Sequence, residues 1–151
     1  MTNIQAMEAT LPVQNYWNPS ITDNALVDNY SPTTLQGYNR VRIEGLVFEN
    51  QVEGTLPLTM YYSGENKDFA TVLNYNMTES GYEFVSIQGY AYPTQEAGTI
   101  PLDMWWSSTR QDYYTIGCLA SLQDAQKYNY KFVGNQGYVY PGPYWNAPLN
   151  Q

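Results

Sequence analysis

The chain has 151 residues with 16 tyrosines and 4 tryptophans but no histidine, and its formal net charge at pH 7 is −8. This length suits one domain, and the negative charge, on a chain with only six Lys and Arg residues, argues against nucleic acid and anionic membranes as partners. The absence of histidine excludes Ser-His and Cys-His nucleophilic systems and histidine metal sites. Charged residues make up only 13% of the chain, so the surface should be rich in amides and hydroxyls, which suit neutral polar ligands.

Cysteine usage and the first residues limit the sites and compartments that can be expected. Cys118 is the only cysteine, which rules out an internal disulfide and a cysteine-based metal site. Its apolar context, TIGCLAS, predicts a buried and inert thiol. The start of the chain has neither the basic head nor the apolar run of a signal peptide, and no segment reaches transmembrane length. We therefore expect a cytoplasmic protein without membrane insertion, with leaderless release left open.

Three similar segments follow one another along the chain and span residues 10–48, 55–92 and 99–140. Three sets of matching residues recur in these segments at intervals of 45 and 44 residues. The sets are Pro12, Pro57 and Pro101; Trp17, Tyr62 and Trp106; and Asp23, Asp68 and Asp112. Residues 1–8 resemble the end of an inter-repeat linker. A proline-rich tail covers residues 141–151, and we expect Tyr144 and Trp145 to anchor it over the domain.

In chain order, each repeat begins with a predicted β-hairpin. Its first strands are expected at 11–18, 56–63 and 100–107, and its second strands at 23–27, 68–72 and 112–116, with a polar turn between them. In the third connection, Ser121 followed by Asp124 predicts one short helix, with weaker turns in the other two copies. The closing strands carry a central glycine (Gly45, Gly89 and Gly137), which predicts a β-bulge or a close backbone approach.

Three copies of one strand-rich segment predict a single all-β, pseudo-threefold domain, residues 1–151, with short helical turns. A β-trefoil-like arrangement is favoured because repeats of about 45 residues are usual for it. A three-bladed β-propeller-like arrangement is the alternative.

The repeats resemble a triplicated repeat family of unknown function found in fungal and bacterial proteins. The resemblance lies in PLDMWWSSTRQDYYTI with GNQGYVYP, in PLTMYYSGENKDFATV with SIQGYAYP, and in LPVQNYWNPSITDNALV with RIEGLVF. The histidine of the family pattern is replaced by Asn24, Phe69 and Tyr113. Because members often accompany secreted carbohydrate-active or peptidase domains, the resemblance implies binding and no chemistry.

Aromatic doublets on the first strands supply the main candidates for a binding site. Alternation predicts that Trp17, Tyr62 and Trp106 pack together in the core near the axis, and that their neighbours face outward. Outward rings beside amides and hydroxyls suit sugars. The candidate residues on the outward faces are Tyr16 with Gln14, Tyr61 with Thr59, and Trp105 with Asp103, joined in the third copy by Arg110 and Gln111 from the adjoining turn. The alternative is that both rings of each doublet are buried between repeat and tail.

The aspartates at the ends of the turns complete the set of candidate ligand-binding residues. Asp23, Asp68 and Asp112 could converge on the axis around Ca²⁺, but turn capping is the simpler explanation and no cofactor is expected. A catalytic pair needs two carboxylates in different environments, whereas repeats supply equivalent ones. We therefore expect no enzyme.

Together these observations predict a carbohydrate-binding protein, a lectin of the fungal, cytoplasmic kind, with up to three non-equivalent sugar sites for glycans or oligosaccharides. The first copy should be the weakest, because Asn24, Ala25 and Leu26 replace the aromatics of the third. A protease inhibitor acting through surface loops and a structural or self-assembling protein remain the alternatives. A homo-oligomer is compatible with each.

Overall fold

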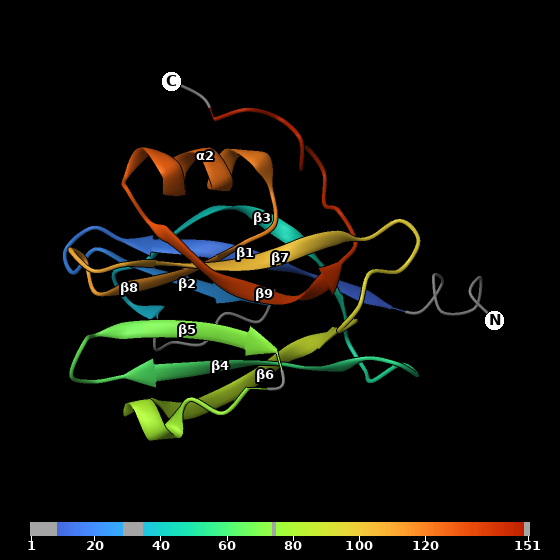
Figure 1. The fold of residues 1–151 in the computed structure, drawn as a ribbon, viewed down its shortest axis with the longest axis horizontal. Coiled ribbons are helices and arrows are strands. Elements are labelled where there is room, and N and C mark those ends of the chain that lie inside the picture. Colours follow the sequence, from blue (N-terminus) through green and yellow to red (C-terminus); the bar gives the residue numbers. More distant parts are fainter. Residues whose placement is uncertain (1–8, 29–34, 74, 150–151) are drawn as a thin grey trace.

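The computed structural model describes residues 9–28, 35–73 and 75–149, and over these ranges the fold is all-β, as expected (Figure 1). The prediction for residues 1–8 lies outside the described residues. The strands are β1 (Thr10–Asn18), β2 (Asp23–Val27), β3 (Asn39–Phe48), β4 (Leu56–Ser63), β5 (Asp68–Leu73), β6 (Glu83–Ala91), β7 (Ile100–Ser107), β8 (Asp112–Ile116) and β9 (Lys131–Val139).

Each three consecutive strands form one antiparallel unit with the first strand in the middle: β2-β1-β3 in unit 1, β5-β4-β6 in unit 2 and β8-β7-β9 in unit 3. Units 1 and 2 join into a six-stranded sheet where Phe48 of β3 pairs with Tyr90 of β6. Single bridges link Tyr92 to Tyr138 and Tyr140 to Leu46. The ends of the three closing strands are therefore connected all the way round.

The predicted hairpins are confirmed, with strand bounds within one residue of those expected. Each turn contains one residue in the left-handed region just before the aspartate: Thr22, Lys67 and Gln111, with φ of 51°, 54° and 55°. The turns are capped by the last residue of the first strand, whose side-chain oxygen accepts a backbone N–H: Asn18 from Ser20, Ser63 from Asn66 and Ser107 from Arg110. The expectation that the aspartates cap these turns is therefore wrong.

The helix predicted in the third connection is confirmed as α2 (Leu119–Lys127), and it covers the outer side of unit 3 (Figure 1). It begins two residues before Ser121, with Cys118 at the N-cap in an extended conformation. The backbone N–H of Leu119 donates to the carbonyl of Trp145 at 2.8 Å, so the C-terminal tail satisfies one donor of the first turn. Among the described residues of the second connection, the one helical element is the 3₁₀ turn η2 (Thr78–Ser80), and residues 29–34 of the first connection lie outside the described ranges.

The central glycines of the closing strands lie at β-bulges and at close approaches between units, so both predicted features are present. In β3 and β6 the ladder shifts register at the residue before the glycine, Glu44 or Gln88, and in β9 the shift spans the equivalent Gln136. A Cβ on Gly89 would lie 2.4 Å from Cγ2 of Val47, and Gly89 has φ of +145°. A larger residue fits neither the space nor the backbone here.

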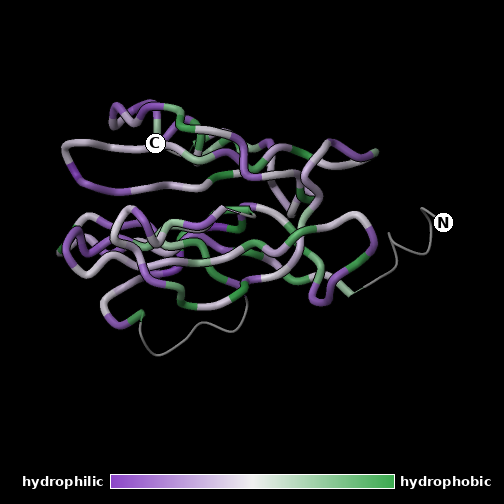
Figure 2. The backbone as a smooth tube through the Cα atoms, turned by 60° about the horizontal axis from the view of Figure 1, so that its bottom comes forward, coloured by the Kyte–Doolittle hydropathy of each residue, from purple (hydrophilic) through white to green (hydrophobic). Residues whose placement is uncertain are grey.

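The main core lies between the three units and contains one set of aliphatic side chains from all of them. Its buried members are Val13, Leu26, Val47, Leu58, Ala91, Leu102 and Val139. The opposite face of each sheet is covered by the connection before its closing strand, through Leu35 in unit 1, Met77 in unit 2 and Ala125 in unit 3. Hydrophilic stretches concentrate at the turns (Figure 2).

The C-terminal tail follows α2, where the backbone N–H of Leu149 donates to the side chain of Gln123. Tyr144 is 86% exposed, so its predicted role as an anchor is wrong; the contacts come from the backbone and from Trp145. In the part of the chain that the structure describes, α2 is too short and too polar to cross a membrane.

Candidate functional site

Asp23, Asp68 and Asp112 meet between the three units, where carboxylate oxygens of all three lie within 4.8 Å of one another. Each carboxylate accepts a backbone N–H from the next unit in a closed cycle. Asp23 accepts from Phe69 at 3.3 Å, Asp68 from Tyr113 at 3.0 Å and Asp112 from Asn24 at 2.9 Å. The aspartates thus connect every unit to its neighbour.

A tyrosine from the same unit as each aspartate donates a further hydrogen bond to the carboxylate. Tyr38 donates its hydroxyl to Asp23 at 2.5 Å, Tyr82 donates to Asp68 at 2.5 Å, and Tyr130 donates to Asp112. Sequence reasoning missed these tyrosines, although each follows the irregular connection of its repeat. All three carboxylates are buried, so they do not face solvent as the sugar hypothesis required of them.

Burial and mutual repulsion shift the protonation of this cluster. Burial raises the pKa of Asp68 to about 8 and that of Asp23 to about 12, and the charge of Asp112 adds to both shifts. The hydrogen bond between Asp23 and Asp68 raises the pKa of Asp23 and lowers that of Asp68. The pKa of Asp112 is also raised, chiefly by burial. At neutral pH the cluster therefore holds protons, which allows three carboxyl groups to lie this close.

A second cycle of bonds uses the bulged residue before each central glycine. Gln88 of unit 2 accepts the backbone N–H of Asp28 at 2.8 Å, and Gln136 of unit 3 accepts that of Leu73 at 2.9 Å. Glu44 of unit 1 accepts that of Gly117 at 2.9 Å. These bonds run in the opposite direction round the molecule from those of the aspartates, so both ends of each second strand are held by a neighbour.

Glu44 differs from the two glutamines because it is a fully buried carboxyl group. It also accepts the backbone N–H of Cys118 and the hydroxyl of Ser121, and Arg42 donates to Ser121 at 2.8 Å. Burial raises the pKa of Glu44, and burial raises the pKa of the Cys118 thiol to about 11. Cys118 is thus buried, as predicted, and its thiol is protonated at neutral pH.

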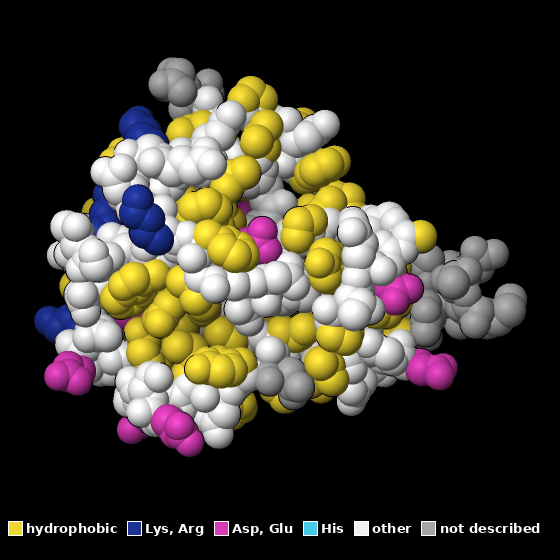
Figure 3. Space-filling model, in the orientation of Figure 1, with side chains coloured by type: hydrophobic (Ala, Val, Ile, Leu, Met, Phe, Trp, Pro, Cys, Tyr) yellow, Lys and Arg dark blue, Asp and Glu magenta, His cyan; other side chains and the backbone are white. Residues whose placement is uncertain are grey.

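The outer face of unit 2 carries a cleft of about 420 Å³ that contains two of the predicted site residues, Thr59 and Tyr61. Two strongly exposed rings border it: Tyr75 at 60% and Phe84 at 59% exposure. Asn76 and Thr78 add polar groups. We call this the outer cleft of unit 2. Hydrophobic side chains gather round a hollow over β5 on the face shown in Figure 3, with acidic residues at its rim.

The outer face of unit 3 has a related cleft of about 210 Å³, the outer cleft of unit 3, which contains Asp103 and Trp105 as predicted. The ring of Trp105 contacts that of Phe132 edge-on, with 5.8 Å between the ring centroids. The rings of Tyr61 and Phe84 make the same kind of contact at 6.4 Å. Trp105 is only half-buried, but it packs against the core under α2, so it is not the free outward ring that alternation predicted. Among the described residues its Nε1 is the one buried side-chain N or O atom without a hydrogen-bond partner.

The outer face of unit 1 differs from those of units 2 and 3 at the position of the exposed phenylalanine. Arg40 stands where β6 and β9 have Phe84 and Phe132, and it donates to Gln14. Tyr16 packs against the small core cluster of Leu35. Sequence reasoning overlooked Phe84 and Phe132, although their equivalent positions, one residue into each closing strand, were readable from the repeats.

The rings assigned to the core lie elsewhere. Trp17, Tyr62 and Trp106 are all half-buried, and Trp17 and Tyr62 line clefts between units, so the expectation that the three rings pack together near the axis is wrong. The core positions of these strands belong to Val13, Leu58 and Leu102, four residues earlier. The ring of Trp106 lies tilted against that of Tyr113, with 4.4 Å between the ring centroids, and Tyr62 lies in the same way against Phe69 at 4.6 Å.

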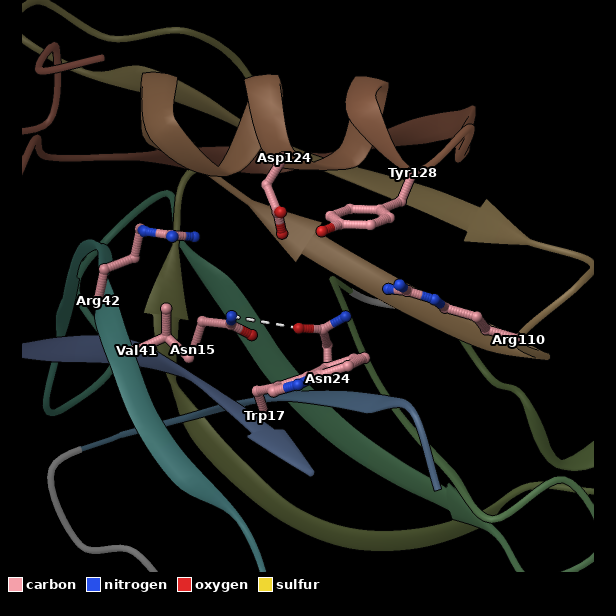
Figure 4. A pocket seen from close by; sticks show the side chains of 8 residues that line it. All are labelled: Asn15, Trp17, Asn24, Val41, Arg42, Arg110, Asp124 and Tyr128. Carbon is pink, nitrogen blue, oxygen red and sulfur yellow. Dashed lines mark hydrogen bonds between the residues drawn. The ribbon is translucent and has the colours of Figure 1, made fainter. Parts of the chain in front are cut away.

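Arg110 is not near Trp105, so the structure separates the predicted third-copy site. Arg110 reaches unit 1, where its guanidinium lies 5.0 Å from the ring of Trp17, and it lies 4.4 Å from the ring of Tyr128 in its own unit. Gln111 is exposed and bonds to the carbonyl of Ser108 in its own turn. Arg110 instead lines a cleft of about 220 Å³ between units 3 and 1, which we call the charged inter-unit cleft (Figure 4).

Protein-family models, curated proteins and solved structures were each compared with this chain, and none of them matches it.

Proposed function

We propose that this protein is a non-enzymatic lectin that binds neutral saccharides in the outer clefts of units 2 and 3. The observation that carries the proposal is the exposed phenylalanine beside the repeat ring in both units, Phe84 with Tyr61 and Phe132 with Trp105. Exposed ring faces stack on the C–H patches of sugars, while nearby hydroxyls and amides orient the ligand.

The two clefts differ in ways that favour two unequal sites. The outer cleft of unit 2 is wider and offers uncharged polar groups, Thr59, Asn76 and Thr78. The outer cleft of unit 3 is narrower and more apolar, with Asp103 as its charged acceptor. In unit 1 Arg40 replaces the phenylalanine, which agrees with the hypothesis that the first copy is the weakest.

The proposal extends to the fold and to the family resemblance of the repeats. We infer that the units are related by an approximate threefold axis, and the presence of one three-stranded antiparallel unit per repeat favours the propeller-like alternative over the trefoil-like one. The resemblance to the fungal and bacterial repeat family and a cytoplasmic location belong to the same proposal.

A glycan array followed by titration of the bound sugars tests this function. Phe84→Ala and Phe132→Ala should each weaken binding of neutral glycans, by about fivefold or more for the loss of one stacking ring. Ile87→Ala is the matched control, because Ile87 is an exposed apolar residue on the same strand as Phe84 but does not line the cleft. Binding that survives both phenylalanine substitutions, or an array without any bound glycan, would refute the proposal.

Self-assembly is the second candidate function, and the exposed apolar residues of the closing strands favour it. Phe84, Ile87, Phe132 and Val133 are all exposed, which is also typical of a protein contact. Sedimentation velocity at several concentrations distinguishes the two: a homo-oligomer that Phe132→Ala dissociates supports assembly, and a monomer throughout supports the lectin.

A further inference from the structure

The charged inter-unit cleft combines groups that the outer clefts lack. Asn15, Trp17 and Asn24 reach it from β1 and β2, and Asp124 and Tyr128 face them from α2 and its C-terminal end (Figure 4). Arg42 and Arg110 enter from different sides. Two of the six basic residues of an acidic chain thus line one small cleft.

The two arginines of the cleft have different interaction partners. Arg42 donates to the hydroxyl of Tyr114 at 3.2 Å, and that hydroxyl donates to Asp124 at 3.0 Å. Arg42 also lies close enough to Glu44 and Asp124 for both to raise its pKa, although burial opposes this. Arg42 is therefore held by hydrogen bonds to the hydroxyls of Tyr114 and Ser121 at its own end of the cleft.

Arg110 lies at the other end and is held by aromatic rings. Its guanidinium contacts the rings of Trp17, Tyr128 and Tyr130 at 5.0, 4.4 and 5.9 Å. Such contacts fix the plane of a guanidinium while they leave N–H donors at its edge. A planar donor edge of this kind matches a carboxylate.

A second cleft between two units can be compared with the charged inter-unit cleft. A cleft of about 420 Å³ between units 1 and 2 is lined by Tyr62, Phe69 and Val85, which are equivalent to Trp17, Asn24 and Val41 of the charged cleft. There Ile21 takes the place of Arg110. Charge is therefore a property of the junction between units 3 and 1, and the general architecture does not require it.

We propose that the charged inter-unit cleft binds a small hydroxylated carboxylate, such as a uronic acid residue. The carboxylate pairs with Arg110, the ring of Trp17 lies against the sugar, and Asn15 and Asp124 accept hydrogen bonds from its hydroxyls. This site is separate from the outer clefts and takes a different class of ligand.

Titration of the protein with D-glucuronate and, in parallel, with D-glucose tests the site. The readout is the indole N–H signal of Trp17 in ¹⁵N-labelled protein, assigned with Trp17→Phe. Glucuronate should shift this signal and glucose at the same concentration should not. Raising NaCl from about 50 mM to about 500 mM should weaken glucuronate binding, because salt screens the ion pair.

Arg110→Gln should weaken glucuronate binding about tenfold or more, the usual effect of losing a hydrogen bond to a charged group. Lys127→Gln is the matched control, because Lys127 lies 5.5 Å from the ring of Tyr128 and carries the same charge but does not line the cleft. Phe84→Ala should leave glucuronate binding unchanged, so failure at this site is distinguishable from failure of the outer clefts. Equal responses to glucose and glucuronate, an unshifted Trp17 signal, or unchanged affinity in Arg110→Gln would overturn the proposal.

Discussion

Asp112 accepts two hydrogen bonds from Asn24, 88 residues earlier in the chain: one from its backbone N–H at 2.9 Å and one from its side-chain amide at 2.7 Å. The Asn24 amide also reaches the hydroxyl of Tyr130 and accepts from Asn15. At the equivalent positions, units 2 and 3 have the aromatic residues Phe69 and Tyr113. The residue that makes unit 1 diverge in sequence therefore joins the first unit to the last.

Asn24→Ala should lower the free energy of unfolding by about 1–3 kcal/mol, because it leaves buried partners of the amide without hydrogen bonds. Chemical denaturation measures the change. Asn50→Ala is the control, since Asn50 is exposed, and it should stay within about 0.5 kcal/mol of the wild type. Equal stability of the two variants would contradict the role of Asn24 at the junction.

Stability should fall as pH rises from about 4 to about 8, contrary to the usual behaviour of carboxylates. Burial raises the pKa of Asp68 from its ordinary value of 3.8 to about 8. Because the folded value is the higher one, the folded protein binds the proton more tightly than the unfolded chain. The stabilisation is complete below about pH 4 and is lost as pH rises toward about 8.

Asp68→Asn should flatten this dependence, because the amide keeps the hydrogen-bonding capacity and has no proton to lose. Thermal melts of the wild type and the variant between about pH 5 and pH 8 measure the effect. Glu79→Gln, which changes the same net charge at an exposed position, should melt with the slope of the wild type. A wild-type Tm that is constant or rises over this range would show that the three carboxyl groups do not share protons.

Exchanging glutamate and glutamine at the bulged positions should change the stability of the fold in opposite directions in units 1 and 2. Glu44→Gln should increase stability at about pH 8, because it removes a buried carboxyl group whose pKa burial raises while it keeps the acceptor for Gly117. Gln88→Glu should destabilise by about 1–3 kcal/mol, because it introduces a buried charge without an arginine partner such as Arg42. Denaturation curves at about pH 8 compare the two, and a loss of stability in both would mean that the Glu44 charge itself supports the junction.

Gly89→Ala should cost about 2–5 kcal/mol, the sum of backbone strain and overpacking. Its φ is +145°, and a Cβ would lie 2.9 Å from the carbonyl oxygen of Phe48 as well as against Val47. Gly64→Ala is the matched control, since a Cβ there meets nothing within 4 Å. Comparable Tm values for the two variants would mean that units 1 and 2 do not approach each other as closely as the structure describes.

The sequence alone predicted the all-β class, the hairpins, the short helix in the third connection and the bulges at the central glycines. These features depend on local chemistry, because turn residues, strand alternation and glycine act on their own neighbourhood. The fixed spacing of Pro12, Pro57 and Pro101 also predicted repeats of about 45 residues, and each of these prolines lies in the first strand of one unit.

Only the tertiary structure decided what each side chain meets. Alternation assigns Trp105 and Trp106 to opposite faces of a strand, but it does not say what covers each face: α2 covers one, and the neighbouring unit approaches the other. The same reason separates Arg110 from Trp105 and brings it to Trp17, because a turn residue reaches whichever unit packs beside it. Asp23, Asp68 and Asp112 are acidic residues at turns in the sequence, and they become a buried junction that holds protons only because the three units place their carboxylate oxygens within 4.8 Å of one another.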